Sequence, residues 1–174
     1  QWYAPYIEDL AAKGIINGKG NNLFDPDGTV KRGEFAKILA AASGDNLSAY
    51  QGDTKFSDVD RNIWYAKYIE WASERSIVNG TSATTFAPEE NISRQEMAVM
   101  IKRYADYKKI TLPKNIAPVT FSDSGSIASW AQEAVSSLQQ AGIISGTGGN
   151  QCNPLGNATR AEAAKMISLF LKLQ

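Results

Sequence analysis

Residues 64–96 read WYAKYIEWASERSIVNGTSATTFAPEENISRQE and contain four landmarks: Trp64, Gly80, Arg94 and Glu96. The same landmarks recur upstream at Trp2, Gly18, Arg32 and Glu34, and downstream at Trp130, Gly146, Arg160 and Glu162. In every copy the Gly follows the Trp by 16 residues and the Arg follows the Gly by 14. Four landmarks held in register through three copies establish an internal repeat, which decides the fold.

Composition excludes several classes of function. Lys plus Arg and Asp plus Glu number 18 each, so the chain has no net charge, and it has no basic block that would favour nucleic acid binding. No stretch approaches the length of apolar residues that spans a membrane, so we expect no membrane insertion. The chain has no histidine, which removes the commonest general base and the usual zinc ligand. We therefore expect no metal and no cofactor.

The single cysteine, Cys152, cannot form an internal disulfide. It occupies the position that Phe24 and Phe86 hold in the other repeats. This correspondence favours a small, buried apolar residue over a reactive thiol.

Each Trp opens an amphipathic helix, because apolar residues follow it at offsets of 4, 5 and 8. These residues are Tyr6, Ile7 and Leu10; Tyr68, Ile69 and Ala72; Ala134, Val135 and Leu138. The helix is expected to close on an Ile or Val pair and the repeated Gly, which is most simply a helix C-cap.

A second helix is predicted to begin at each Arg. Ser93 and Thr159 precede Arg94 and Arg160, and a Glu stands three residues after each hydroxyl, which forms a capping box. The first repeat has Lys31 and Gly33 in this motif, so its helix start lacks the cap. The loss is expected to cost about 1 kcal/mol and to let that end fray.

Apolar positions in the three second helices complement each other in size. Phe35 and Met97 correspond to Ala163, and Ala42 corresponds to Tyr104 and Phe170. Layers of this kind favour a central three-helix bundle over a linear solenoid. The predicted fold is mainly α, with repeats at 1–50, 51–113 and 114–174 that together form one structural unit.

The segment Phe56-Ser57-Asp58 before Trp64, the Ile-Val-Asn-Gly turn, the Phe-Ala-Pro loop and Thr159-Arg160-Ala161-Glu162 resemble the S-layer homology domain of bacterial surface proteins. All three copies match over nearly the whole chain. The resemblance implies a pseudo-threefold spindle with a central bundle and three protruding lobes. It also implies an extracellular, non-catalytic module that anchors proteins to the cell wall by binding secondary cell wall polysaccharide between the lobes. The ligand of such grooves is typically a terminal N-acetylmannosamine that carries a pyruvate ketal.

The repeated residue types suit an anionic sugar. A guanidinium at a helix start, where backbone amides are free, grips a carboxylate with two parallel bonds. A Trp beside it offers a flat apolar face to a sugar ring. The candidate ligand-binding residues are Arg32, Arg94, Arg160, Trp2, Trp64, Trp130, Asp58, Asp123, Gly18, Gly80 and Gly146.

Each candidate also has a structural interpretation. Trp at the head of an amphipathic helix is more often part of a core, and Arg in a first turn is often a solvated charge. Asp58 and Asp123 accept from sugar hydroxyls or hold the Arg in place. The glycines permit positive φ and close backbone approach at a groove wall. The repeated Glu is explained by the capping box.

The copies are not equivalent. The sequence begins at Gln1-Trp2, so the first repeat shows no counterpart of Phe56-Ser57-Asp58 and Phe121-Ser122-Asp123. Ala131 stands where the other repeats have Tyr3 and Tyr65. We expect the groove chemistry of the first repeat to depart most from the others.

Two other functions remain as alternatives to wall anchoring. A wall-active glycosidase needs a close pair of carboxylates, and none stands out beyond the capping Glu residues. A helical-repeat scaffold for protein partners, or for S-layer lattice assembly, needs an exposed apolar groove and is indifferent to pyruvate. We expect the isolated module to be a monomer.

Overall fold

The computed structural model describes residues 1–174, which form six α-helices and two 3₁₀ turns but no β-strand. The elements are α1 (Ala4–Ala12), α2 (Arg32–Ser43), α3 (Ala66–Glu74), α4 (Arg94–Tyr107), η1 (Ser124–Ser126), η2 (Ser129–Ala131), α5 (Gln132–Gln140) and α6 (Arg160–Leu171). The prediction of a mainly α chain with two helices in each repeat is therefore confirmed. None of the helices combines the length and the apolar character that crossing a membrane requires.

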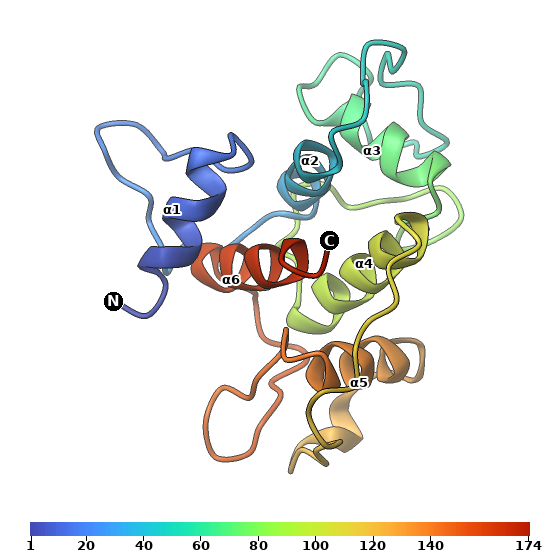
Figure 1. The fold of residues 1–174 in the computed structure, drawn as a ribbon. Coiled ribbons are helices and arrows are strands. Elements are labelled where there is room, and N and C mark those ends of the chain that lie inside the picture. The colour runs from blue at the N-terminus through green and yellow to red at the C-terminus, as the bar shows by residue number, and fades with distance from the viewer.

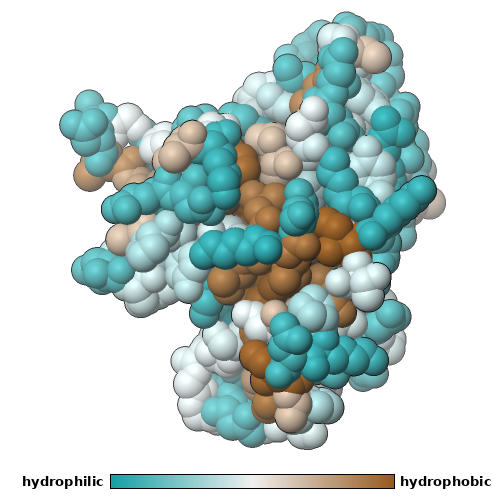
Figure 2. Space-filling model, in the orientation of Figure 1, coloured by the Kyte–Doolittle hydropathy of each residue, from teal (hydrophilic) through white to brown (hydrophobic).

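The longer helices α2, α4 and α6 converge at the centre of the molecule, and α1, α3 and α5 lie outside them on three sides (Figure 1). Each outer helix packs against the long helix of a different repeat: α1 on α6, α3 on α2 and α5 on α4. The repeats consequently share one hydrophobic core of 40 buried residues. Figure 2 shows hydrophobic residues exposed where the central helices converge, with hydrophilic residues around them.

The core contains the layers predicted from the sequence. Phe35, Met97 and Ala163 are each no more than 1% exposed. In the next layer the rings of Tyr104 and Phe170 have centroids 5.3 Å apart. Ala42, the third member of this layer, is only partly buried and packs against the core. Large side chains from two helices thus pack with a small one from the third in both layers.

A ring of backbone hydrogen bonds joins the segments that lead into the central helices. Val30 N–H donates to the carbonyl of Ala158 (3.2 Å), Ala158 N–H to that of Ile92 (3.0 Å), and Ile92 N–H to that of Val30 (2.8 Å). These residues hold equivalent places in the three repeats, two positions before each Arg. The cycle closes only when all three repeats are present, so it ties the first repeat directly to the last.

The second helices start as the capping motifs predict. Ser93 and Thr159 accept from the backbone N–H of Glu96 (3.3 Å) and Glu162 (3.2 Å), and both carboxylates accept from the cap residue's own N–H. In the first repeat Lys31 provides no cap, although its N–H still donates to Glu34 (2.8 Å). The Lys31 side chain instead forms an ion pair with Glu89 of the second repeat.

The prediction that the first helices close on Gly18, Gly80 and Gly146 is wrong. These helices end at Ala12, Glu74 and Gln140, and the left-handed residues that follow them are Gly14 (φ 69°), Ser76 (φ 57°) and Gly142 (φ 77°). The next N–H then folds back onto the helix: Ile15 donates to Leu10, Ile77 to Ala72 and Ile143 to Leu138. This is a Schellman ending, which uses a left-handed residue earlier than the repeated Gly.

Candidate functional site

Three surface grooves are built to one plan, and each combines all three repeats. One repeat supplies the turn that contains the repeated Gly, together with the capping Glu. Taking the repeats in cyclic order, the preceding repeat supplies the Arg and the following repeat supplies the Trp. Groove 1 contains Gly18, Glu34, Arg160 and Trp64; groove 2 contains Gly80, Glu96, Arg32 and Trp130; groove 3 contains Gly146, Glu162, Arg94 and Trp2. Their volumes are about 280, 370 and 330 Å³, which suits a small ligand such as a sugar.

Each Arg is fixed at one end by the loop of the next repeat. Arg32 Nε donates to the carbonyl of Phe86 (2.8 Å), Arg94 Nε to Cys152 (2.9 Å) and Arg160 Nε to Phe24 (2.8 Å). The guanidinium carbon of Arg160 also lies 4.4 Å from the ring centroid of Phe24. Because Nε is occupied, only the outer nitrogens of each guanidinium remain for other partners.

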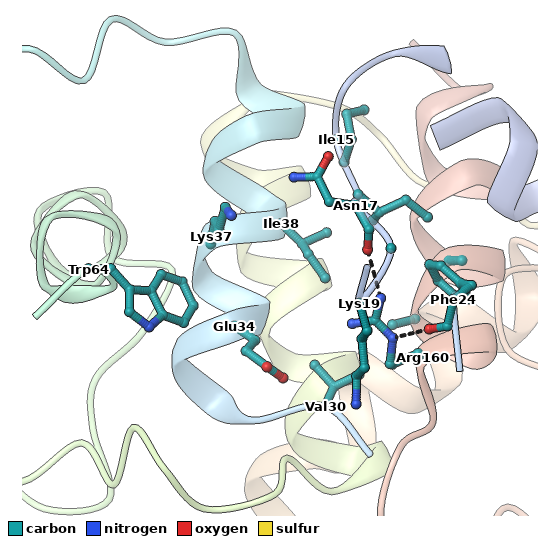
Figure 3. A pocket seen from close by; sticks show the side chains of 14 residues that line it. Ile15, Asn17, Lys19, Phe24, Val30, Glu34, Lys37, Ile38, Trp64 and Arg160 are labelled. Carbon is teal, nitrogen blue, oxygen red and sulfur yellow. Dashed lines mark hydrogen bonds between the residues drawn. The ribbon is translucent and has the colours of Figure 1, made fainter. Parts of the chain in front are cut away.

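The outer nitrogens distinguish groove 1 from the other two. Arg32 Nη1 donates to Glu96 in groove 2 (2.7 Å), and Arg94 forms the equivalent ion pair with Glu162 in groove 3. In groove 1 Arg160 forms no ion pair with Glu34. Its Nη2 donates to the carbonyl of Asn17 (2.8 Å), and its Nη1 has no protein acceptor (Figure 3).

The backbone amides at the helix starts are not free for a ligand, contrary to expectation. Arg32, Arg94 and Arg160 N–H groups donate to the carbonyls of Glu90, Gly156 and Gly28. The next amide in each helix donates to a proline carbonyl: Gly33 to Pro88, Gln95 to Pro154 and Ala161 to Pro26. The loops of neighbouring repeats use these donors, so the helix-start amides are not open to a ligand in the grooves.

Asp58 and Asp123 line none of the three grooves but support the loops that hold Arg32 and Arg94. Asp58 accepts from the N–H of Phe86 (2.9 Å) and Ala87 (2.7 Å), and Asp123 accepts from Cys152 (2.8 Å) and Asn153 (2.7 Å). These backbone bonds, led by the one from Cys152, hold the pKa of Asp123 below its usual value. The two carboxylates thus hold the Arg in place indirectly, through the carbonyls of Phe86 and Cys152.

The repeated glycines allow close approach of the turn to its own loop. A Cβ at Gly80 would lie 2.4 Å from the carbonyl oxygen of Thr85, and Gly80 has a φ of 86°. Gly18 and Gly146 do not have positive φ, yet a Cβ there would come within 2.8 Å of Leu23 O and 2.9 Å of Gln151 O. Close approach is therefore the shared requirement, and positive φ applies to Gly80 alone.

Trp2, Trp64 and Trp130 are exposed by 56%, 51% and 56%, so the interpretation of these residues as core is wrong. They precede their helices, which begin at Ala4, Ala66 and Gln132, and their rings stand at the groove edges. In groove 1 the α2 residues Glu34, Lys37 and Ile38 lie between Trp64 and Arg160 in the view of Figure 3.

Sequence reasoning missed further cations in the grooves. Lys37 and Lys19 line groove 1, Arg103 lines groove 2 and Lys165 lines groove 3. Lys37 Nζ lies 5.4 Å from the Trp64 ring centroid, and Lys165 Nζ lies 5.8 Å from that of Trp2. Lys37 and Lys165 follow their Arg by five residues, so the register contained this signal. The second repeat has Val99 at that position and supplies Arg103 one helical turn later.

Cys152 is 2% exposed, which confirms the prediction of a small buried residue. Burial raises the pKa of its thiol. No three His, Cys, Asp or Glu side chains come together in a group suited to a metal ion.

Comparison with known proteins identifies the family to which the chain belongs. The family model described as S-layer homology domain matches residues 1–36, 55–98 and 120–164. The chain is 36% identical over 166 residues to an amylopullulanase of Thermoanaerobacterium thermosulfurigenes, covering 95% of this chain and 9% of that protein. It is 36% identical over 172 residues to an endoglucanase of Bacillus sp. (strain KSM-635), covering 98% and 18%.

A third relative is S-layer protein EA1 of Bacillus anthracis, which is 31% identical over 172 residues and of which this chain covers 19%. The chain spans less than a fifth of the length of each of these three relatives. The part they share with it is the repeat unit described above. The chain therefore belongs to the S-layer homology domain family, whose members are non-catalytic modules that attach surface proteins to the cell wall.

Proposed function

We propose that the chain binds the terminal, pyruvate-ketal N-acetylmannosamine of a secondary cell wall polysaccharide in the grooves between its repeats. In this way it anchors to the bacterial wall whatever protein carries it. The relatives include both enzymes and S-layer proteins, which fits an attachment unit that is independent of the activity attached to it.

The observation that carries the proposal is the pairing of an exposed Trp with cations in each groove. A sugar stacks on an indole face, and the carboxylate of a ketal needs a positive partner. Trp64 lines groove 1 together with Lys37 and Arg160, and neither cation forms an ion pair with a protein carboxylate. The groove thus offers a flat apolar surface and two cations without an ion pair, which outnumber its one carboxylate, Glu34.

The grooves are expected to differ in affinity. In grooves 2 and 3 the guanidinium already pairs with Glu96 or Glu162, so a ligand carboxylate must compete for it. In groove 1 Nη1 of Arg160 is unused, and the guanidinium presents an edge that suits a carboxylate. We therefore expect groove 1 to bind most tightly, and the three grooves together to add avidity on one polymer.

The proposal is tested by titrating the chain with pyruvylated and unmodified N-acetylmannosamine and measuring the heat of binding. Only the pyruvylated sugar is expected to bind, and Arg160→Ala should weaken its binding to groove 1 by about 2 kcal/mol or more. Arg75→Ala is the control, because this exposed arginine lines none of the three grooves.

Equal affinity for the two sugars would contradict the proposal. So would unchanged binding when Trp2, Trp64 and Trp130 are all replaced by Ala, a variant expected to fold because these side chains are exposed. If the chain instead binds a protein surface, free pyruvylated sugar will not compete with that partner.

A further inference from the structure

An open pocket, separate from the three grooves, lies next to groove 1 and shares Trp64 with it. It has a volume of about 490 Å³, and Trp64 and Lys37 line both it and groove 1. Its remaining lining includes Arg61, Lys67, Tyr68 and Tyr50. The two hollows therefore share a border, and a ligand longer than one sugar can extend from one into the other.

The chemistry of this pocket resembles that of the groove. The Trp64 and Tyr68 rings have centroids 6.5 Å apart at an interplanar angle of 61°, which gives two aromatic surfaces that face different directions. Lys67 Nζ lies 5.1 Å from the Tyr68 ring centroid, and Lys37 Nζ lies 5.4 Å from that of Trp64. Aromatic rings beside cations suit a sugar chain that carries acidic groups.

The charge in the pocket is positive. Its lining contains three cations, Lys37, Lys67 and Arg61, and no carboxylate. Arg61 pairs with the nearby Asp53 at 3.1 Å, but both side chains are about 60% exposed, so water and salt weaken that attraction. Lys37 and Lys67 form no ion pair. An acidic ligand consequently meets two uncompensated ammonium groups.

The residues that line this pocket are not repeated beside the other two grooves. The residues three and four positions after Trp64 are Lys67 and Tyr68, whereas Glu133 and Ala134 follow Trp130 at these offsets and Pro5 and Tyr6 follow Trp2. The Arg61 position, three before Trp64, is Ile127 in the third repeat. The combination of two cations and a tyrosine is specific to the second repeat, so the repeated fold does not require it.

We infer that this pocket is an additional subsite for the sugar residues that follow the terminal one, so that groove 1 and the pocket together bind an acidic glycan of at least two residues. This inference rests on the proposed function of groove 1. The terminal sugar occupies groove 1, and the glycan crosses the edge of Trp64 to reach Tyr68. Groove 1 then discriminates between a free monosaccharide and an intact polymer end, whereas grooves 2 and 3 do not.

The test isolates groove 1 by replacing the exposed Trp2 and Trp130 with Ala, which removes the aromatic face of grooves 3 and 2. In this background, dissociation constants are measured for pyruvylated N-acetylmannosamine and for fragments of purified wall polysaccharide, three or more sugars long, that end in the same sugar. The fragment is expected to bind about tenfold more tightly than the monosaccharide. This advantage should shrink as the salt concentration rises.

Adding Arg61→Ala and Lys67→Ala should reduce the advantage of the fragment to about twofold or less while leaving monosaccharide affinity unchanged. Tyr68→Leu should act in the same direction and keeps the partly buried position apolar. Lys172→Ala is the matched control, because Lys172 lies 5.8 Å over the Tyr6 ring and forms a similar Lys–Tyr pair outside the pocket. This variant should retain the full advantage.

Equal affinity of fragment and monosaccharide, or an advantage that survives all three substitutions, would overturn the subsite and leave the proposed function intact. If the variant without Trp2 and Trp130 still unfolds cooperatively but does not bind the monosaccharide, the proposed function of groove 1 is overturned, and the subsite with it.

Discussion

Arg32 of the first repeat and Glu96 of the second are joined by an ion pair of 2.7 Å across the repeat boundary, with the Arg32 side chain only 8% exposed. The same guanidinium donates to the carbonyl of Phe86. Arg94 and Glu162 repeat this relationship between the second and third repeats, but Arg160 and Glu34 do not. The repeated Arg residues therefore join neighbouring repeats as well as line the grooves.

Arg32→Ala should lower the free energy of unfolding by about 2–3 kcal/mol, because it leaves Oε1 of Glu96 and the Phe86 carbonyl without their donor. Arg61→Ala breaks only the exposed pair with Asp53 and should cost about 0–1 kcal/mol. Urea unfolding of the two variants checks the difference. Equal losses would show that the buried position of the Arg32 pair adds nothing.

Asp45→Ala should lower the free energy of unfolding by about 1–2 kcal/mol near neutral pH. The Asp45 carboxylate accepts from Trp71 Nε1 (2.8 Å) and Tyr107 Oη (2.6 Å) and faces Lys108, so it links the end of α2 to α3 and α4. Burial alone would raise the pKa of Asp45, but the Tyr107 and Trp71 hydrogen bonds and the Lys108 charge outweigh it and lower that pKa.

The sign of this shift sets the pH dependence. The stabilisation is fully present above the ordinary Asp pKa of about 3.9 and is lost as the pH falls through the lower, folded-state value. The stability difference between wild type and Asp45→Ala should therefore narrow in acid. Urea unfolding from neutral to strongly acidic pH measures it, and a difference that stays constant over this range would contradict the assignment.

Gly80→Ala should destabilise the chain by about 2 kcal/mol or more, since the new methyl group meets the Thr85 carbonyl and the Phe56 ring at a backbone φ of 86°. Gly125→Ala is the control. A Cβ at Gly125 has no neighbour within 4 Å, so its effect should stay within about 0.5 kcal/mol. Thermal unfolding of both variants gives the comparison, and a stable Gly80→Ala protein would show that this turn can widen.

Trp64→Ala should leave stability nearly unchanged and weaken sugar binding, because half of the side chain is exposed at the groove edge. Trp71→Ala should instead lower the free energy of unfolding by about 3–5 kcal/mol, because this fully buried Trp belongs to the core. Paired unfolding and binding titrations distinguish the two. A large stability loss in Trp64→Ala would restore the interpretation of this residue as core.

Much of the fold could be predicted because it depends on local chemistry. The hydroxyl caps at Ser93 and Thr159 lie three residues from the amides they accept, and the apolar offsets after each Trp select one helical face. The early helix endings were missed because the left-handed position is Gly in two repeats, at Gly14 and Gly142, but Ser76 in the other. Ser76 adopts the left-handed conformation without being Gly, so the register of glycines pointed to the wrong position.

The sequence by itself determined the three copies, their two helices each, the capping motifs and the residue types that suit an anionic sugar. The tertiary structure alone decided which copies meet in a groove. Arg160 reaches Phe24 and Asn17 across 136 and 143 residues of chain, and Trp64 completes that groove from a third repeat. Spacing within a repeat determines contacts over a few helical turns only. The contacts of Arg160 and Trp64 in groove 1 exist because the three repeats close into a ring. The same closure pairs the helix-start amides, which the sequence had suggested were free, with carbonyls of neighbouring repeats.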